Sequence, residues 1–128
     1  MICQYKTILI EADTINEDFV AVAERIKDKY ELVLISDGLA QNKGVDKYIQ
    51  TKIFGAEAGC KKPSIEFFDF VLEKIGKKPS ECILVDCQVK SLLFAEEVGI
   101  STLFFNVKNE NFDGMSVCSF KELIDVIG

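Results

Sequence analysis

The sequence predicts a single α/β domain over residues 1–128, with a three-layer α/β/α Rossmann-like fold. Short, continuous apolar runs alternate along the chain with segments whose apolar residues repeat at helical spacing. This alternation is typical of βαβ crossovers, in which helices cover both faces of a parallel sheet. We therefore expect a mainly parallel sheet of five to six strands, and the length of 128 residues suits one domain with its own core.

The predicted strands are short apolar runs, several of them rich in β-branched residues. Because these runs are apolar at successive positions, we expect their strands to be buried on both faces of the sheet. In chain order the predicted strands are 7–10 (TILI), 31–35 (ELVLI), 51–54 (TKIF), 82–85 (CILV), 101–105 (STLFF) and a marginal one at 117–118.

The predicted helices have start and stop signals at their ends. They are 16–29 with Asn16 as N-cap, a helix with Pro63 in its first turn and Gly76 as its stop, 92–98 closed by Gly99, and 120–127 capped by Ser119. Three connections are also expected: a loop or short helix at 39–44, one helical turn at 45–49 and a loop at 55–61.

The composition excludes several classes of function. The net charge of −6, with acids and bases interleaved, argues against a nucleic-acid surface. No apolar run is long enough to span a membrane, and the start of the chain does not read as a signal peptide. The five cysteines show no paired metal-ligand spacing, so we expect reduced thiols in a cytoplasmic protein. The absence of histidine excludes catalysis by a Ser-His-Asp or Cys-His arrangement.

Polar residues stand where the predicted strands end. Glu11 and Asp13 follow the first strand, Ser36 follows the second, and Asp86 follows the fourth, while Lys62 precedes the helix that leads into the fourth. In doubly wound sheets, ligands bind outside the carboxyl ends of the strands. Carboxylates, a hydroxyl and an ammonium at one edge suit a divalent cation and a phosphate.

With these residues the chain resembles the haloacid dehalogenase-like (HAD) phosphohydrolase superfamily over nearly its whole length. The matching stretches, in order, are ILIEADTI, VLISDG, GCKKPSIEFF and ILVDCQVKSLLFAEEVGI. In that family an aspartate after the first strand attacks phosphorus, and a second aspartate two residues later serves as acid and base.

The resemblance implies a role for each matching residue. Glu11 and Asp13 would be the catalytic pair, and Ser36 and Lys62 would bind the phosphoryl oxygens. Mg²⁺ would be the cofactor, held by Glu11, Asp13 and Asp86. Each residue also has a plainer interpretation: Asp13 as a loop acid, Ser36 as a helix cap and Lys62 as a solvated lysine.

The sequence departs from the family pattern in its first motif. Glu11 stands where the family has the nucleophilic aspartate, Thr14 replaces a usual glycine, and Ser91 falls where a further Asp or Asn is common. The longer side chain of Glu11 still suits a metal but displaces the attacking oxygen, so catalysis is expected to be weak or lost. Whether the chain is an enzyme is therefore left open by its sequence.

Both segments that carry cap domains in this family are short here. Residues 12–35 separate Glu11 from Ser36, and residues 37–61 separate Ser36 from Lys62. We therefore expect no cap domain and an open site, covered by a protein partner or by a second copy of the chain.

Three functions remain open from the sequence. The first is an Mg²⁺-dependent phosphatase-like hydrolase acting on a phosphorylated substrate of unspecified identity. The second is an inactive relative that binds a phosphorylated ligand or a protein. The third is a receiver-type signalling domain, which is disfavoured because the predicted third strand ends on Ile53-Phe54 rather than on an aspartate.

Overall fold

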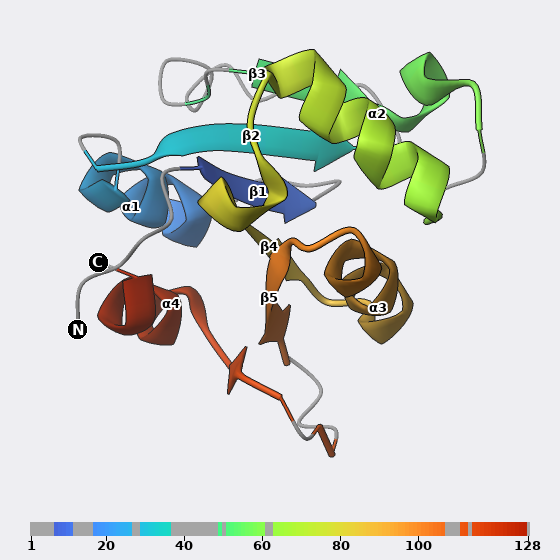
Figure 1. Cartoon of the computed structure of the whole chain (residues 1–128). Helices are drawn as coiled ribbons and strands as arrows, with labels where there is room; N and C mark the ends of the chain where they lie inside the picture. The colour runs from blue at the N-terminus through green and yellow to red at the C-terminus, as the bar shows by residue number, and fades with distance from the viewer. Residues whose placement is uncertain are drawn as a thin grey trace.

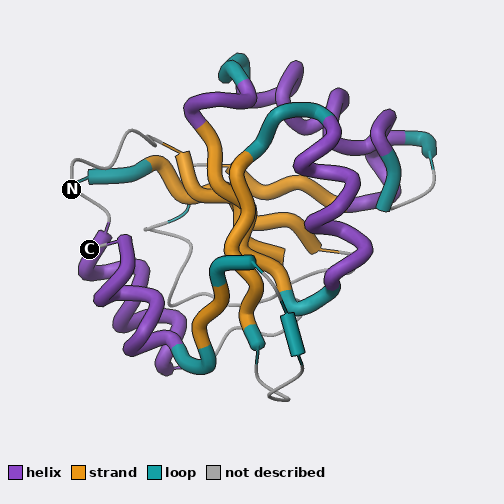
Figure 2. Tube along the Cα trace, turned by 60° about the horizontal axis from the view of Figure 1, so that its bottom comes forward, coloured by secondary structure: helices purple, strands orange, loops and turns teal. Residues whose placement is uncertain are grey.

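The computed structural model describes residues 7–11, 17–26, 29–36, 49, 51–60, 63–106, 111–112 and 114–127. These residues form a central sheet with helices on both faces (Figures 1 and 2). The strands are β1 (Thr7–Glu11), β2 (Glu31–Ser36), β3 (Thr51–Phe54), β4 (Cys82–Asp86), β5 (Ser101–Phe105) and β6 (Ser116–Val117). The α-helices are α1 (Glu17–Ile26), α2 (Ile65–Ile75), α3 (Val89–Glu97) and α4 (Phe120–Ile127), and the short 3-10 helices are η2 (Gly55–Ala58) and η3 (Pro79–Glu81).

The sheet has six strands in the order β3-β2-β1-β4-β5-β6, and every pairing is parallel. The predicted three-layer, Rossmann-like fold is thus confirmed, and the sheet is wholly parallel rather than mainly so. A receiver-type domain would have the flavodoxin-like order 2-1-3-4-5. Here β2 lies between β1 and β3, so the strand order rules out the receiver interpretation.

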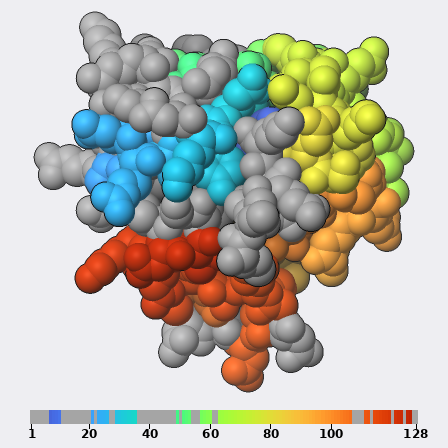
Figure 3. Space-filling model, turned by 60° about the vertical axis from the view of Figure 1, so that its left-hand side comes forward, coloured from blue at the N-terminus to red at the C-terminus, as the bar shows by residue number. Residues whose placement is uncertain are grey.

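Two apolar clusters, one on each face of the sheet, form the core. The first joins alternate residues of the strands, such as Ile10 and Val85, to helices α1 and α4. The second joins the intervening residues, such as Leu9 and Leu84, to α2 and α3. Figure 3 views the molecule from the side on which α1 and α4 are both exposed. Because both faces are covered, the continuous apolarity of the strands is explained.

Helix α2 begins later than the sequence predicts. Its N-cap is Ser64, whose Oγ accepts a hydrogen bond from the Phe67 N–H at 3.1 Å, so Pro63 precedes the helix instead of occupying its first turn. A serine hydroxyl satisfies a backbone donor that would otherwise be left open, which fixes the start at Ile65. The predicted stop is confirmed, since Gly76 takes a left-handed conformation with φ of 67°.

The other described boundaries differ from the predicted ones by a few residues at most, and the predicted N-cap Asn16 lies outside the described residues. Helix α3 begins at Val89, three residues before the expected start, and α1 is shorter than 16–29. Residues 55–58 form a 3-10 turn within the predicted loop. Ser119 caps α4 as predicted, because its Oγ accepts the Glu122 N–H at 3.2 Å. The expected connection at 39–44 and most of the turn at 45–49 lie outside the described residues.

No helix in the described part of the chain is both long and apolar enough to cross a membrane.

Candidate functional site

The carboxyl ends of β2, β1 and β4 lie next to one another and define what we call the carboxyl edge. From β1 the chain runs outward through β2 and β3 on one side, then returns to β4 on the other side of β1. The strand order therefore reverses between β1 and β4, which is the point where doubly wound sheets bind ligands. Ile10 pairs with Val85, so the next positions, Glu11 and Asp86, stand side by side.

Asp86 is the best-defined polar residue at this edge. It ends β4 and is only 2% exposed, although its side chain is a carboxylate. Its Oδ1 accepts a hydrogen bond from the Gln88 N–H at 3.0 Å, which directs the chain into α3. A buried carboxylate at the carboxyl edge offers oxygen ligands of the kind that a divalent cation prefers.

The backbone of two other predicted site residues reaches the same edge. Glu11 ends β1 and pairs with Ile35, and Ser36 ends β2 one residue further along. The structure thus brings three of the five predicted positions together: 11, 36 and 86. Asp13 and Lys62 lie outside the described residues, so their predicted positions stay predictions.

The segments flanking residues 61–62 are tied to α2. On one side, Glu57 in η2 forms an ion pair with Lys74 in the last turn of α2, and the Lys74 Nζ lies 5.9 Å from the centre of the Phe70 ring. On the other side stands the Ser64 cap. The described residues on either side of 61–62 are therefore anchored to α2.

The donor set at the carboxyl edge suits a hard cation. Glu11 and Asp86 both offer oxygen ligands, which Mg²⁺ prefers. No three His, Cys, Asp or Glu side chains come together within the described residues, and of the three predicted carboxylates only that of Asp86 is described. The Cys82 thiol is an unsuitable ligand, because burial and the nearby Glu81 raise its pKa to about 11.

Ser91 is a residue whose environment the sequence did not reveal. It lies in the first turn of α3 and is fully buried, with no hydrogen bond to its Oγ from any described residue. Its burial was readable from helical spacing, since Ser91 stands four residues before the buried Ala95. The lack of a hydrogen-bond partner for the Ser91 Oγ could not be predicted from the sequence, because it depends on how separate helices and strands pack together.

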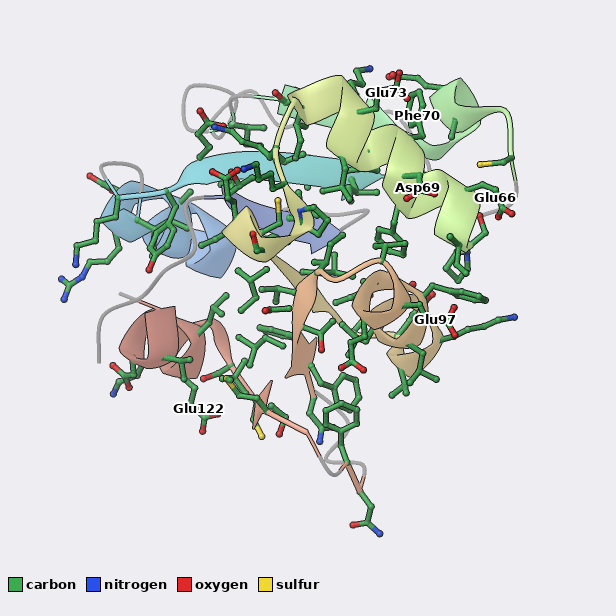
Figure 4. All side chains as sticks on the ribbon, in the orientation of Figure 1. Glu66, Asp69, Phe70, Glu73, Glu97 and Glu122 are labelled. Atoms are coloured by element: carbon green, nitrogen blue, oxygen red, sulfur yellow. The ribbon has the colours of Figure 1, made fainter. Side chains whose placement is uncertain are left out.

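Acidic side chains mark the outer surface above the second core cluster. Glu66, Asp69 and Glu73 project from α2, and Glu97 projects from α3, away from the sheet (Figure 4). A nucleic-acid surface would instead carry clustered lysines and arginines. The absence of nucleic-acid binding stays a prediction from the sequence.

One curated protein is similar in sequence over most of the chain. Glyceraldehyde 3-phosphate phosphatase of Methanocaldococcus jannaschii is 26% identical over an alignment that covers 75% of this chain and 48% of that protein. The chain thus spans about half the length of this relative. No protein-family model matches the chain.

Several solved structures share the fold. A dehalogenase with an intermediate complex has a TM-score of 0.79 at 19% identity, covering 89% of this chain and 57% of its own. A HAD phosphatase from Thermococcus onnurineus has a TM-score of 0.74 at 20% identity, covering 89% of this chain and 58% of its own. A Bacillus subtilis protein assigned as a HAD-hydrolase and bound to magnesium has a TM-score of 0.76 at 13% identity, covering 87% and 54%.

These likenesses extend over 87–89% of the chain. The predicted resemblance is confirmed: the chain has the core fold of the haloacid dehalogenase-like hydrolases and phosphatases.

Proposed function

We propose that this chain is a HAD-like phosphohydrolase-type domain that binds Mg²⁺ and a phosphorylated ligand at the carboxyl edge. The observation that carries the proposal is the buried carboxylate of Asp86, side by side with position 11 where the strand order reverses. The name of the curated relative, a phosphatase of a sugar phosphate, supports a phosphate monoester as the ligand class.

Each residue contributes through its own chemistry. The carboxylates of Glu11 and Asp86, with Asp13, would hold the metal, and Ser36 and Lys62 would donate hydrogen bonds to the phosphoryl oxygens. Mg²⁺, when bound, neutralises negative charge on the phosphoryl group. Asp13 would exchange a proton with the leaving or attacking oxygen.

Glu11 determines whether binding leads to turnover. Its carboxylate stands one methylene further from the backbone than that of aspartate, and an error of about 1 Å in the position of a reacting group can cost roughly a hundredfold in rate. We therefore infer that ligand binding is retained while hydrolysis is weak or lost. The alternative within this proposal is a catalytically inactive module that binds a phosphorylated ligand.

An activity assay tests the catalytic part. We expect Glu11→Asp to raise Mg²⁺-dependent hydrolysis of p-nitrophenyl phosphate, by up to about a hundredfold, and Asp86→Asn to abolish it. Glu31→Asp is the matched control, because it makes the same shortening at an exposed position at the opposite end of the neighbouring strand. An inactive wild type with no gain in Glu11→Asp would refute the idea of a dormant catalyst.

A thermal-shift assay tests the binding part. Mg²⁺ with inorganic phosphate at about 100 times its Kd should stabilise the folded chain by about 2.7 kcal/mol. Asp86→Asn and Lys62→Met should each remove most of this shift. If millimolar Mg²⁺ and phosphate leave the wild-type melting temperature unchanged, the binding proposal is wrong.

A protein partner, or a second copy of the chain, is the second candidate for what this domain binds. Ile65 and Val89, in the first turns of α2 and α3, are 38% and 36% exposed, and Leu93 is 58% exposed. Exposed apolar side chains on α2 and α3 suit contact with another protein surface. Sedimentation velocity of the wild type and Leu93→Lys tests self-association; identical monomeric profiles would leave only a different protein as the cover.

We also propose a cytoplasmic location. Among the described residues, Cys60, Cys82 and Cys118 form no disulfide, which supports a reducing compartment. Microscopy of a tagged chain would test this, and secretion of the chain would contradict it.

A further inference from the structure

The outward side of α3 exposes apolar side chains. Leu93 is 58% exposed, and Val89, one turn earlier, is 36% exposed. The opposite side of the helix, with Ser91, Leu92 and Ala95, is buried. A single exposed apolar residue is ordinary on a protein surface, so the residues around Leu93 decide whether it marks a contact.

Leu93 lies at the centre of the exposed side of α3. Successive residues of an α-helix are about 100° apart around its axis. This spacing places Val89 and Glu96 on one flank of Leu93, and Lys90 and Glu97 on the other. All five residues are exposed, so the apolar centre has an acid on both flanks and a lysine on only one.

The two charges on the second flank are available to a partner. Neither Lys90 nor Glu97 forms an ion pair with another described residue, and Glu97 projects away from the sheet (Figure 4). On the first flank, by contrast, the Glu96 Oε1 accepts a hydrogen bond from the Thr102 Oγ1 at 2.7 Å. Lys90 stands three residues before Leu93, and Glu97 stands four residues after it. Opposite charges therefore lie about one turn to either side of the apolar centre.

This arrangement is complementary to itself. When two copies of α3 pack antiparallel with Leu93 against Leu93, a two-fold axis places each Lys90 beside Glu97 of the other copy. A parallel arrangement would instead place each of these charges beside the same residue of the other copy, which is repulsive. The charges on α3 therefore favour one orientation, the antiparallel one.

We propose that the outward side of α3, centred on Leu93, is the interface of an antiparallel two-fold dimer of this chain. The proposal commits to a second copy of the chain as the partner, and it does not depend on Mg²⁺ or phosphate binding. Val89, Leu93 and Glu97 form a ridge of residues four apart, and two such ridges pack at an angle of about −50°. Because α3 has only 9 residues, the interface is small and its affinity lies in the micromolar to millimolar range.

The acidic side chains of α2 confine the contact to α3. Glu66, Asp69 and Glu73 project from α2 away from the sheet (Figure 4). An interface that extended over α2 would bring these acids close to those of the other copy, which is unfavourable. A contact through α3 alone leaves them in solvent, where about 0.1 M salt screens charges more than about 10 Å apart.

Sedimentation velocity of the full chain, without Mg²⁺ or phosphate, tests the interface. In about 0.1 M salt the wild type should shift from monomer to dimer between about 10 µM and about 1 mM protein. Leu93→Ala, Lys90→Glu and Glu97→Lys should each weaken the dimer roughly tenfold. A wild type that is still a monomer at about 1 mM, or a dimer that none of these variants weakens, would overturn the proposal.

A charge-matched variant separates this interface from general repulsion between acidic chains. Glu97→Lys changes the net charge from −6 to −4, because one charge of −1 becomes +1, so general repulsion falls. The proposed interface nevertheless predicts weaker association, since the new lysine lies beside Lys90 of the other copy. Glu73→Lys makes the same change in net charge on α2 and should not weaken the dimer. If both variants strengthen association equally, the interface is not on α3.

Mixing two variants tests the two-fold geometry. When Lys90→Glu and Glu97→Lys are mixed, the introduced acid of one lies beside the introduced lysine of the other, and the native Glu97 lies beside the native Lys90. The mixture should therefore form a mixed dimer roughly tenfold tighter than either variant forms alone, which also shows that both variants are folded. The double variant Lys90→Glu/Glu97→Lys should dimerise like the wild type. A mixture that associates no better than its components would refute the antiparallel contact.

The dimer and the ligand site are tested separately. A chain that dimerises through α3 but responds to neither Mg²⁺ nor phosphate would refute the proposed function alone. A chain that responds to both ligands but stays a monomer would refute this interface alone.

Discussion

The Cys82 thiol should give the stability of this domain a measurable dependence on alkaline pH. Cys82 begins β4 and is fully buried, and its Sγ lies 3.6 Å from the Lys78 carbonyl oxygen to which it donates. Burial, and secondarily the charge of Glu81, raise its pKa from 9.0 to about 11. In the folded state the thiol therefore keeps its proton at pH values where the unfolded chain has lost it.

The direction follows from proton binding. Between pH 9 and 11 the folded state holds more protons than the unfolded state, so stability falls as pH rises through this range. Below about pH 9 the contribution is fully present. A pKa shift of this size contributes about 3 kcal/mol to the free energy of unfolding. About 2 kcal/mol of this contribution should be lost by about pH 10.5.

Urea unfolding, followed by circular dichroism with a reductant present, measures the effect. The free energy of unfolding of the wild type should fall between pH 8 and 10.5 by about 2 kcal/mol more than that of Cys82→Ala. Cys118→Ala, which removes an exposed thiol, should behave as the wild type. Equal losses in the wild type and Cys82→Ala would show that the buried thiol does not have a raised pKa.

Two further predictions concern the segments on either side of residues 61–62. Ser64→Ala should lower the free energy of unfolding by about 1 kcal/mol, because it removes the N-cap bond of α2, and should weaken phosphate binding in a thermal-shift assay; unchanged phosphate binding would separate the cap from the site. A double-mutant cycle on Lys74 and Glu57, both partly exposed, should give a coupling energy of about 0.2–1 kcal/mol in urea unfolding. The ion pair between Lys77 and Glu31, whose charged atoms lie 3.7 Å apart, is the control and should give a smaller coupling energy. A larger coupling energy for Lys77 and Glu31 would contradict a stabilising contact between η2 and α2.

Much of the fold was predictable because the strands are buried on both faces. Burial of this kind leaves continuous apolar runs in the sequence, and the predicted strand at 101–105 is the observed β5. The start of α3 was not predictable in the same way. Val89 and Lys90 form the first turn of that helix but face solvent, so they carry no part of its apolar stripe. Strand β6 is two residues long and exists through its pairing with β5.

The sequence predicted which chain positions meet at the candidate site. It predicted less well what each side chain does there. The end of each parallel strand is marked in the sequence by the change from apolar to polar residues, so positions 11, 36 and 86 were expected at one edge, where their backbone now lies. The roles of Glu11, Ser36 and Lys62 stay predictions. The environment of Ser91 could not be predicted, because a sequence does not show whether a buried hydroxyl forms a hydrogen bond.

The strand order has a consequence for how the chain acquires its native state during synthesis. Strand β1 pairs on one side with β2, the next strand in the chain, and on the other side with β4. Ile10 therefore pairs with Val85 only after the ribosome has synthesised the long segment between them. Before β4 is synthesised, a partial sheet of β1, β2 and β3 would expose the edge of β1 that later pairs with β4. Such an unpaired strand edge is prone to pair with other chains. The pairing of β1 with β4 is also the one that sets Asp86 beside position 11. A ribosome-bound fragment that stops before β4 would therefore have no ligand site, and stalling experiments on nascent chains could time its appearance.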